Sequence, residues 1–185
     1  MNQTTDNPGR TLVQHGLRWG VILGVVAIIL SMAVYAIDYT LLVQLKMLFF
    51  ILALYMGVAI YAGIDFRNAT GGYLSYGKAW QHAMVIFAIS AVISTLFNFV
   101  LYFVIDPELP AKLTEAALEN QRAMMQSFGA PESAIETEMA KARVRTENQY
   151  TPSGLALGFG IFLVISAVLS LISSIFVKKN EPIEM

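Results

Sequence analysis

Residues 154–177 are GLALGFGIFLVISAVLSLISSIFV, a run of 24 residues without a charged side chain. A helix needs about 20 apolar residues to cross the hydrocarbon layer of a membrane. Three similar runs occupy residues 17–37, 47–64 and 80–105, and the only Lys, Arg, Asp or Glu in them is Arg18, near the start of the first. Four such runs in 185 residues are more than a water-soluble core requires. The sequence therefore predicts an all-α, polytopic membrane protein with four transmembrane helices.

The composition excludes several classes of protein. Hydrophobic residues make up 56% of the chain and charged residues 14%, which is too apolar for an ordinary soluble domain. A net charge of −1 without a Lys/Arg stripe argues against a nucleic-acid partner. The chain has no Cys, so disulfides, thiolate metal sites and thiol catalysis are excluded. Four spans and one extramembrane segment fill residues 1–185, which predicts a single domain.

A positive flank formed by Arg10 and Arg18 at the first run is also typical of a secretory signal peptide. The run of about 20 apolar residues is longer than the core of about 7–15 residues in a signal peptide. Its glycines recur at intervals of four, a helix-packing pattern without use in a peptide that is removed. We expect the first span to be retained; cleavage after Ala36 is the alternative.

Basic residues near the span ends predict the orientation. Those on one side of a four-pass topology are Arg10, Arg18, Arg67, Lys78, Lys178 and Lys179. Cytoplasmic flanks of membrane spans carry an excess of Lys and Arg. We therefore expect a multi-pass protein of the bacterial inner membrane, with both termini and the second loop in the cytoplasm and residues 107–150 outside.

Residues 107–150 predict a helical hairpin between the third and fourth spans. Pro110 suits the first turn of one helix, and the sequence Gly129-Ala130-Pro131 ends it and begins the next. The apolar stripes of both helices are thin, so we expect them to lean on each other, on the bilayer surface or on a partner. A solvated hairpin without any ligand is the simpler alternative.

Small residues recur at intervals of four in the first and fourth spans. They are Gly16, Gly20, Gly24, Gly154, Gly158, Ser166, Ser170 and Ser174. Such spacing lets helix backbones approach closely in lipid. We expect these residues to pack spans within the chain; formation of a homo-oligomer or docking on another membrane protein is the alternative.

Polar residues in the third span form a second pattern. Ser90, Ser94 and Asn98 are four residues apart and lie near one face of a helix. Polar side chains at membrane depth turn toward the bundle interior or a wet cavity. A structural role, with hydroxyls bonded to their own helix and Asn98 joining two helices, is the simpler interpretation. A polar track for transport is the alternative.

The two histidines, His15 and His82, fall near the predicted cytoplasmic ends of the first and third spans. They could bind a metal or respond to pH, but no acidic residue accompanies them at ligand spacing in the sequence. We expect hydrogen-bonded, interfacial histidines, and an interfacial pair or headgroup contacts for Asp65 and Arg67. No catalytic residue, cofactor site or metal site is predicted, so we expect the protein not to be an enzyme; an intramembrane enzyme acting on lipid is a weaker alternative.

The loop between the second and third spans is the most distinctive stretch: Asp65-Phe66-Arg67-Asn68, then Gly71-Gly72-Tyr73-Leu74-Ser75-Tyr76-Gly77-Lys78-Ala79-Trp80. Ile105-Asp106-Pro107-Glu108 follows the third span. Residues 10–180 resemble a family of small four-span membrane proteins of Bacteroidota known as domain of unknown function 4199. The resemblance implies the fold, topology and lineage, and no reaction. Physically, the two glycines suit a tight turn and Ser75 suits a helix N-cap.

These patterns favour a non-enzymatic accessory or structural protein of the envelope that presents the external hairpin. The partners expected are membrane lipids, a membrane or periplasmic protein, or a second copy of the chain. A small transporter or channel subunit that uses the polar track is the alternative function. Docking of Tyr73, Tyr76 and Trp80 on a cytoplasmic partner is a further possibility.

Overall fold

The computed structural model describes residues 11–181, so Arg10 lies outside the described residues. Four of its helices are long and apolar enough to cross a membrane, which confirms the predicted all-α membrane fold. They are α1 (Leu12–Asp38), α2 (Leu45–Ala69), α3 (Tyr76–Val100) and α6 (Pro152–Val177). A 3₁₀ turn, η1 (Tyr39–Val43), follows α1, and a π-helical turn, η2 (Leu101–Ile105), extends α3. The hairpin consists of α4 (Leu109–Ser127) and α5 (Glu132–Gln149).

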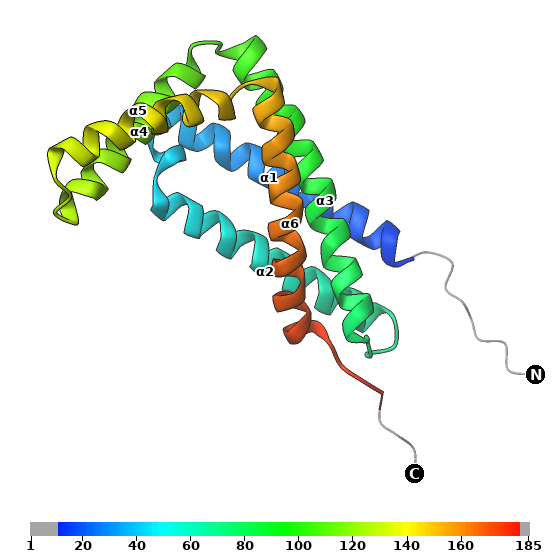
Figure 1. The fold of residues 1–185 in the computed structure, drawn as a ribbon. Helices are drawn as coiled ribbons and strands as arrows, with labels where there is room; N and C mark the ends of the chain where they lie inside the picture. Colours follow the sequence, from blue (N-terminus) through cyan, green and yellow to red (C-terminus); the bar gives the residue numbers. More distant parts are fainter. Residues whose placement is uncertain (1–10, 182–185) are drawn as a thin grey trace, which may run out of the picture.

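The two ends of the molecule differ in what they contain (Figure 1). The start of α1, the α2–α3 loop and the end of α6 gather at one end, which we call the terminal end. The hairpin and η1 lie at the opposite end, the hairpin end. In Figure 1 the hairpin runs sideways from the tops of α3 and α6, and it does not continue their direction.

Glycines on α1 let this helix lie directly against α3. A side chain at any of the three positions would collide with α3 at 2.8–3.0 Å. The nearest side chains are Val85 for Gly16, Ile89 for Gly20 and Ile93 for Gly24. Both helices advance by four residues from one contact to the next, so α1 and α3 run parallel, as alternate spans of a four-pass chain must. Small residues at this spacing permit such backbone approach in lipid.

Helix α6 packs antiparallel to α3. The Tyr76 hydroxyl donates to the carbonyl of Leu171 at 3.0 Å, and the Trp80 indole donates to that of Ala167 at 3.3 Å. Contacts therefore move four residues forward on α3 and four backward on α6. The serines Ser166, Ser170 and Ser174 are buried on α6. Their small side chains allow close packing of α6, while the other faces of this helix keep large apolar side chains exposed, as lipid contact requires.

The α2–α3 loop is tied to the end of the chain. Gly71 and Gly72 have φ of 98° and 84°, a region that favours glycine, so the chain can reverse here. Leu74 and Lys179 then exchange both backbone hydrogen bonds, at 2.8 and 2.9 Å. The expectation that the side chain of Ser75 caps α3 is wrong: Ser75 is the N-cap residue, but its side chain makes no capping bond.

The apolar core is concentrated midway along the spans. Leu23, Ile86 and Phe87 are fully buried there, together with Tyr55, whose ring stacks near Phe87 with centroids 6.0 Å apart. A second cluster, around Leu109 and its neighbours in α4, joins the hairpin to the ends of α1 and α3. The core therefore holds the spans together and also fixes the base of the hairpin.

Candidate functional site

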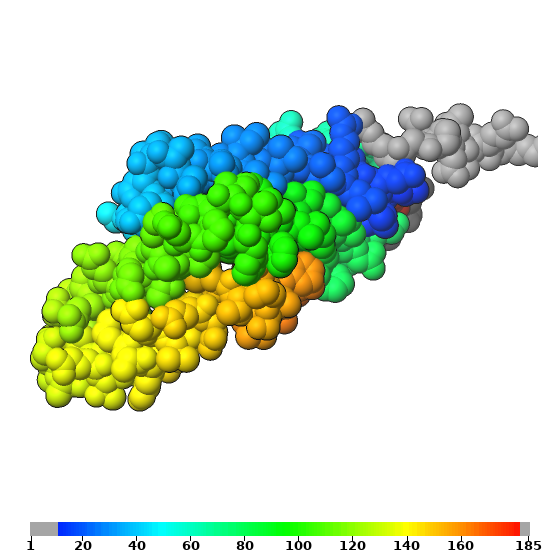
Figure 2. Space-filling model, turned by 90° about the horizontal axis from the view of Figure 1, so that it is seen from above, coloured from blue at the N-terminus to red at the C-terminus, as the bar shows by residue number. Residues whose placement is uncertain are grey.

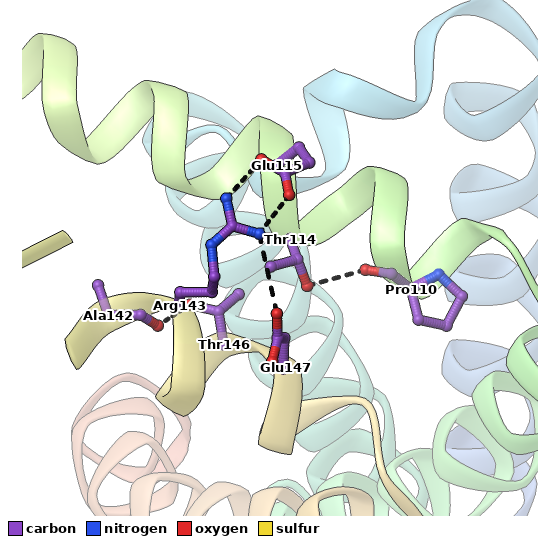
Figure 3. Close-up of polar contacts among 7 residues, drawn as sticks. All are labelled: Pro110, Thr114, Glu115, Ala142, Arg143, Thr146 and Glu147. Atoms are coloured by element: carbon purple, nitrogen blue, oxygen red, sulfur yellow. Dashed lines mark hydrogen bonds and ion pairs between the residues drawn. The ribbon is translucent and has the colours of Figure 1, made fainter. Parts of the chain in front are cut away.

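Two regions of the described chain concentrate polar contacts: the hairpin and the terminal end. In the hairpin, both terminal guanidinium nitrogens of Arg143 on α5 donate to the carboxylate of Glu115 on α4, one of them at 3.0 Å (Figure 3). Glu147, one turn further along α5, lies 3.8 Å from the same guanidinium. The Arg143 guanidinium lowers the pKa of the Glu115 carboxyl below its ordinary value, mainly through the hydrogen bonds. A planar, bidentate pair of this kind sets the register of the two helices.

The turn and the base of the hairpin carry their own ion pairs. Arg122 meets Glu132 at 3.0 Å across the turn. At the base, Lys112 lies 3.2 Å from Glu108 and 3.8 Å from Asp106. The Arg122–Glu132 pair joins the two helices near the turn, while the Lys112 contacts are local to the start of α4; exposed pairs of this kind are individually weak.

The base of the hairpin is anchored to the spans by apolar and hydrogen-bonded contacts. Leu109 and Leu113 are almost completely buried against residues of α1, η1 and α3. The hydroxyl of Tyr35 donates to Asp106 at 2.9 Å. Tyr150, at the end of α5, packs edge-on against Tyr102 with ring centroids 5.4 Å apart. The direction of the hairpin is therefore set by the spans.

The distal half of the hairpin exposes large apolar side chains. Phe128 at the turn is 83% exposed and Met124, one turn earlier, is 48% exposed. Figure 2 shows this part of the hairpin projecting beyond the spans. Ile135 of α5, by contrast, is buried between the two hairpin helices. The hairpin thus buries one thin apolar stripe and leaves an apolar tip uncovered.

At the terminal end, three residues from three spans form a hydrogen-bonded chain. His15 Nε2 lies 3.0 Å from Asp65 Oδ2, and His15 Nδ1 lies 2.8 Å from His82 Nε2. Both histidines are buried, whereas the side chain of Asp65 is 44% exposed. Phe66 stacks on the His82 ring with centroids 5.0 Å apart and an interplanar angle of 12°. The carboxylate accepts from His15, so this chain connects the surface to the bundle interior.

The geometry of the histidine chain differs from that of a metal site. The two ring nitrogens of His15 face different partners, so the three residues form a line, whereas metal ligands converge on one point. Among residues 11–181 no group of three His, Cys, Asp or Glu could hold a metal ion. His82 Nδ1 is buried and has no hydrogen-bond partner among residues 11–181.

The predicted pairing of Asp65 with Arg67 is wrong. Asp65 bonds His15, while Arg67 donates to the carbonyl of Val177 at 2.9 Å. Residues two apart on a helix point to different faces, so the two side chains diverge. The Arg67 guanidinium instead satisfies a free carbonyl at the end of α6, where a cation also suits the helix dipole. The histidines are hydrogen-bonded as expected, but they lie inside the bundle.

The three residues of the predicted polar stripe on α3 lie in two different environments. The Ser90 hydroxyl donates to the Tyr55 hydroxyl at 3.0 Å inside the core. Ser94 and Asn98 instead line a cavity of about 600 Å³ between α3 and α6, and also a smaller one of about 170 Å³ between α1, α2 and α3. Ser90 therefore makes a structural contact in the core, whereas Ser94 and Asn98 border the two cavities.

The remaining glycines occupy different environments. A side chain at Gly154 would collide with the carbonyl oxygen of Asn148, so this residue lets the hairpin return closely to α6. Gly158, four residues later, has no atom within 4 Å of where its Cβ would be, and the same holds for Gly77 of the α2–α3 loop. The small residues of α1 thus contact a neighbouring span, while Gly158 borders the larger cavity.

The His15–His82–Asp65 chain was missed because its members are 50 and 67 residues apart in sequence. The only signal available was that all three lie near span ends predicted to share one side of the membrane. That signal places the residues at a similar depth and says nothing about their direction around each helix axis.

Comparison with known proteins gives a family and no activity. A family model described as "Protein of unknown function (DUF4199)" matches residues 18–179. No curated protein and no solved structure matches the chain.

Proposed function

Because the chain belongs to the DUF4199 family, which is described only as of unknown function, we propose a role from its geometry. We propose a non-enzymatic accessory protein of the membrane that presents the α4–α5 hairpin to a protein partner. The partner is a membrane or periplasmic protein with an apolar recess for the hairpin tip.

The observation that supports this role most is the combination of a fixed base and an uncovered tip. Leu109 and Leu113 hold the base, and the Glu115–Arg143 pair fixes the two helices relative to each other. Phe128 is then exposed at the far end. Aromatic residues and Met are enriched at protein–protein interfaces, and Met124 and Phe128 are both exposed near the turn.

A pair of point variants tests this role. Phe128→Ser removes the apolar tip, while Val144→Ser removes an exposed apolar side chain elsewhere on the hairpin, where Val144 is 59% exposed. Tagged proteins would be cross-linked briefly in their native membrane, purified in mild detergent and analysed by mass spectrometry. We expect one stoichiometric partner with the parent chain and Val144→Ser, and its loss with Phe128→Ser. Equal recovery with both variants would contradict the proposal.

We propose a bacterial inner membrane, of the Bacteroidota, as the location, with both termini in the cytoplasm. The support is the distribution of Lys and Arg at the span ends and the family resemblance. The chain has no Cys, so a single Ser127→Cys variant at the exposed hairpin can be labelled selectively. We expect an impermeant maleimide to label it in intact spheroplasts. Labelling only after permeabilisation would reverse the orientation.

A small transporter or channel subunit is the second candidate. It is favoured by the two cavities that share Tyr55, Ser94 and Asn98 as lining residues. Against it, Ser90 is already bonded to Tyr55, so the polar track stops in the core. Solute flux in proteoliposomes that is abolished by Asn98→Leu would favour this candidate over the accessory role.

A further inference from the structure

The cavity of about 600 Å³ between α3, the end of α5 and the start of α6 has two chemically different ends. At the hairpin end it is lined by hydrogen-bond donors: Arg145, Asn148, Gln149 and Ser153. Toward the middle of the spans it is lined by Leu157, Ile161 and Phe162 of α6 and by Ala91 of α3. From residue 153 to residue 162 the wall formed by α6 is about 14 Å long at 1.5 Å per residue.

The volume and polarity of this cavity fit an amphipathic ligand. Sites for small molecules occupy about 300–1,000 Å³ and combine apolar walls with a few placed polar groups. The apolar end lies among membrane-spanning helices, where the acyl chains of membrane lipids can occupy it. The donors at the other end include the cation Arg145, which has Glu138 at 3.5 Å and remains 68% exposed. Ser94 Oγ, in the wall between these ends, has no partner among the described residues.

We propose that this cavity binds one glycerophospholipid molecule. Its phosphodiester is held by Arg145 with the amides of Asn148 and Gln149, because phosphate oxygens accept from such donors. One acyl chain follows α6 past Gly158, where the missing side chain leaves space. This inference does not depend on the hairpin having a protein partner.

Two glycines of α6 provide a matched test. Gly158 lines the cavity, whereas Gly160 does not, and neither has an atom within 4 Å of its Cβ position. Gly158→Phe fills the cavity, and Gly160→Phe places the same side chain outside it. Protein extracted in mild detergent would be examined by native mass spectrometry. We expect one retained phospholipid in the parent chain and in Gly160→Phe, and at least tenfold lower occupancy in Gly158→Phe. Equal occupancy in the two variants, or no retained phospholipid in any sample, would overturn the proposal.

A titration of the delipidated protein tests the headgroup contacts. Phosphatidylglycerol and a long-chain alcohol without phosphate would be added separately, and the shift of the thermal unfolding midpoint measured. We expect phosphatidylglycerol to stabilise the parent chain, and to do so less in Arg145→Ala, while the alcohol has a much smaller effect. Equal stabilisation by the two ligands would overturn the assignment of the phosphodiester. A normal unfolding transition of ligand-free Gly158→Phe would show that its loss of lipid is not a loss of fold.

Discussion

The terminal end and the hairpin end of this protein are held together by different physical means. At the terminal end, buried histidines, a backbone bridge and glycine contacts join the four spans. At the hairpin end, exposed ion pairs and one thin apolar stripe join two helices. The difference indicates that buried contacts fix the relative positions of the spans at the terminal end, whereas the hairpin is accessible to other molecules.

The two ends should also differ in how well they tolerate substitutions. The two histidines and the α1 glycines are buried, so removal of a histidine partner leaves a buried polar group, and a larger side chain at a glycine causes a steric clash. Contacts in the hairpin face water, which replaces a lost partner at little cost. Substitutions at the terminal end should therefore cost more stability than those in the hairpin.

The largest effect is expected where α1 meets α3. Gly20→Leu would drive a side chain into the backbone carbonyl of Ile86, 2.9 Å from the Cβ position. Overpacking costs typically about 1–3 kcal/mol of the free energy of unfolding and occasionally more, and an obstructing backbone atom cannot move aside as a side chain can. Gly57→Leu is the matched control, because nothing lies within 4 Å of that position. Thermal unfolding in detergent measures both, and a Gly20→Leu midpoint equal to that of Gly57→Leu would refute the close contact.

A smaller effect is expected in the histidine chain. His82→Leu leaves the Nδ1 atom of His15 buried without a partner, which costs about 1–3 kcal/mol. The double variant His15→Leu/His82→Leu removes both partners, and we expect it to be more stable than His82→Leu alone. Denaturant unfolding of both variants measures the difference. If the double variant is the less stable of the two, the histidines are not coupled as described.

Acid should loosen the hairpin before the spans. The pKa of Glu115 is lowered in the folded chain by Arg143, so this contact stabilises the hairpin above the ordinary pKa of 4.5. The stabilisation is lost as pH falls through the lower, folded pKa. Spin labels at Ala123→Cys and Glu136→Cys, on opposite hairpin helices, should therefore give a distance distribution that broadens reversibly at pH below 4.5. Glu115→Gln should be broadened already at neutral pH; an unchanged response in this variant would contradict the role of the pair.

The smallest effect on stability is expected at the tip. Phe128→Ser removes a side chain that is 83% exposed, and surface substitutions of this kind change the free energy of unfolding by less than about 0.5 kcal/mol. We expect its thermal unfolding midpoint to equal that of Val144→Ser. A clear destabilisation by Phe128→Ser alone would mean that the tip is packed against the protein and does not serve as a docking surface.

The sequence predicted the helices and their ends better than it predicted the contacts between helices. The four long apolar runs and the break at Gly129-Ala130-Pro131 each reflect a local requirement, membrane length or helix termination, so spans and hairpin were recognisable. The bond between His15 and Asp65 depends on how each helix is rotated about its axis, which apolar spans specify only weakly. The cavity beside Ser94 and Asn98 could not be foreseen, because its walls come from α3, the end of α5 and α6, which only the folded chain brings together.

The measurement that tests the central claim most directly is photo-cross-linking from the hairpin tip in the native membrane. A photoreactive phenylalanine analogue would replace Phe128 in one strain and Val144 in another, and adducts would be identified by mass spectrometry. If the hairpin presents its tip to a protein partner, one protein adduct should form at position 128 and be absent at position 144. Adducts to lipid alone at position 128, or the same products at both positions, would contradict it.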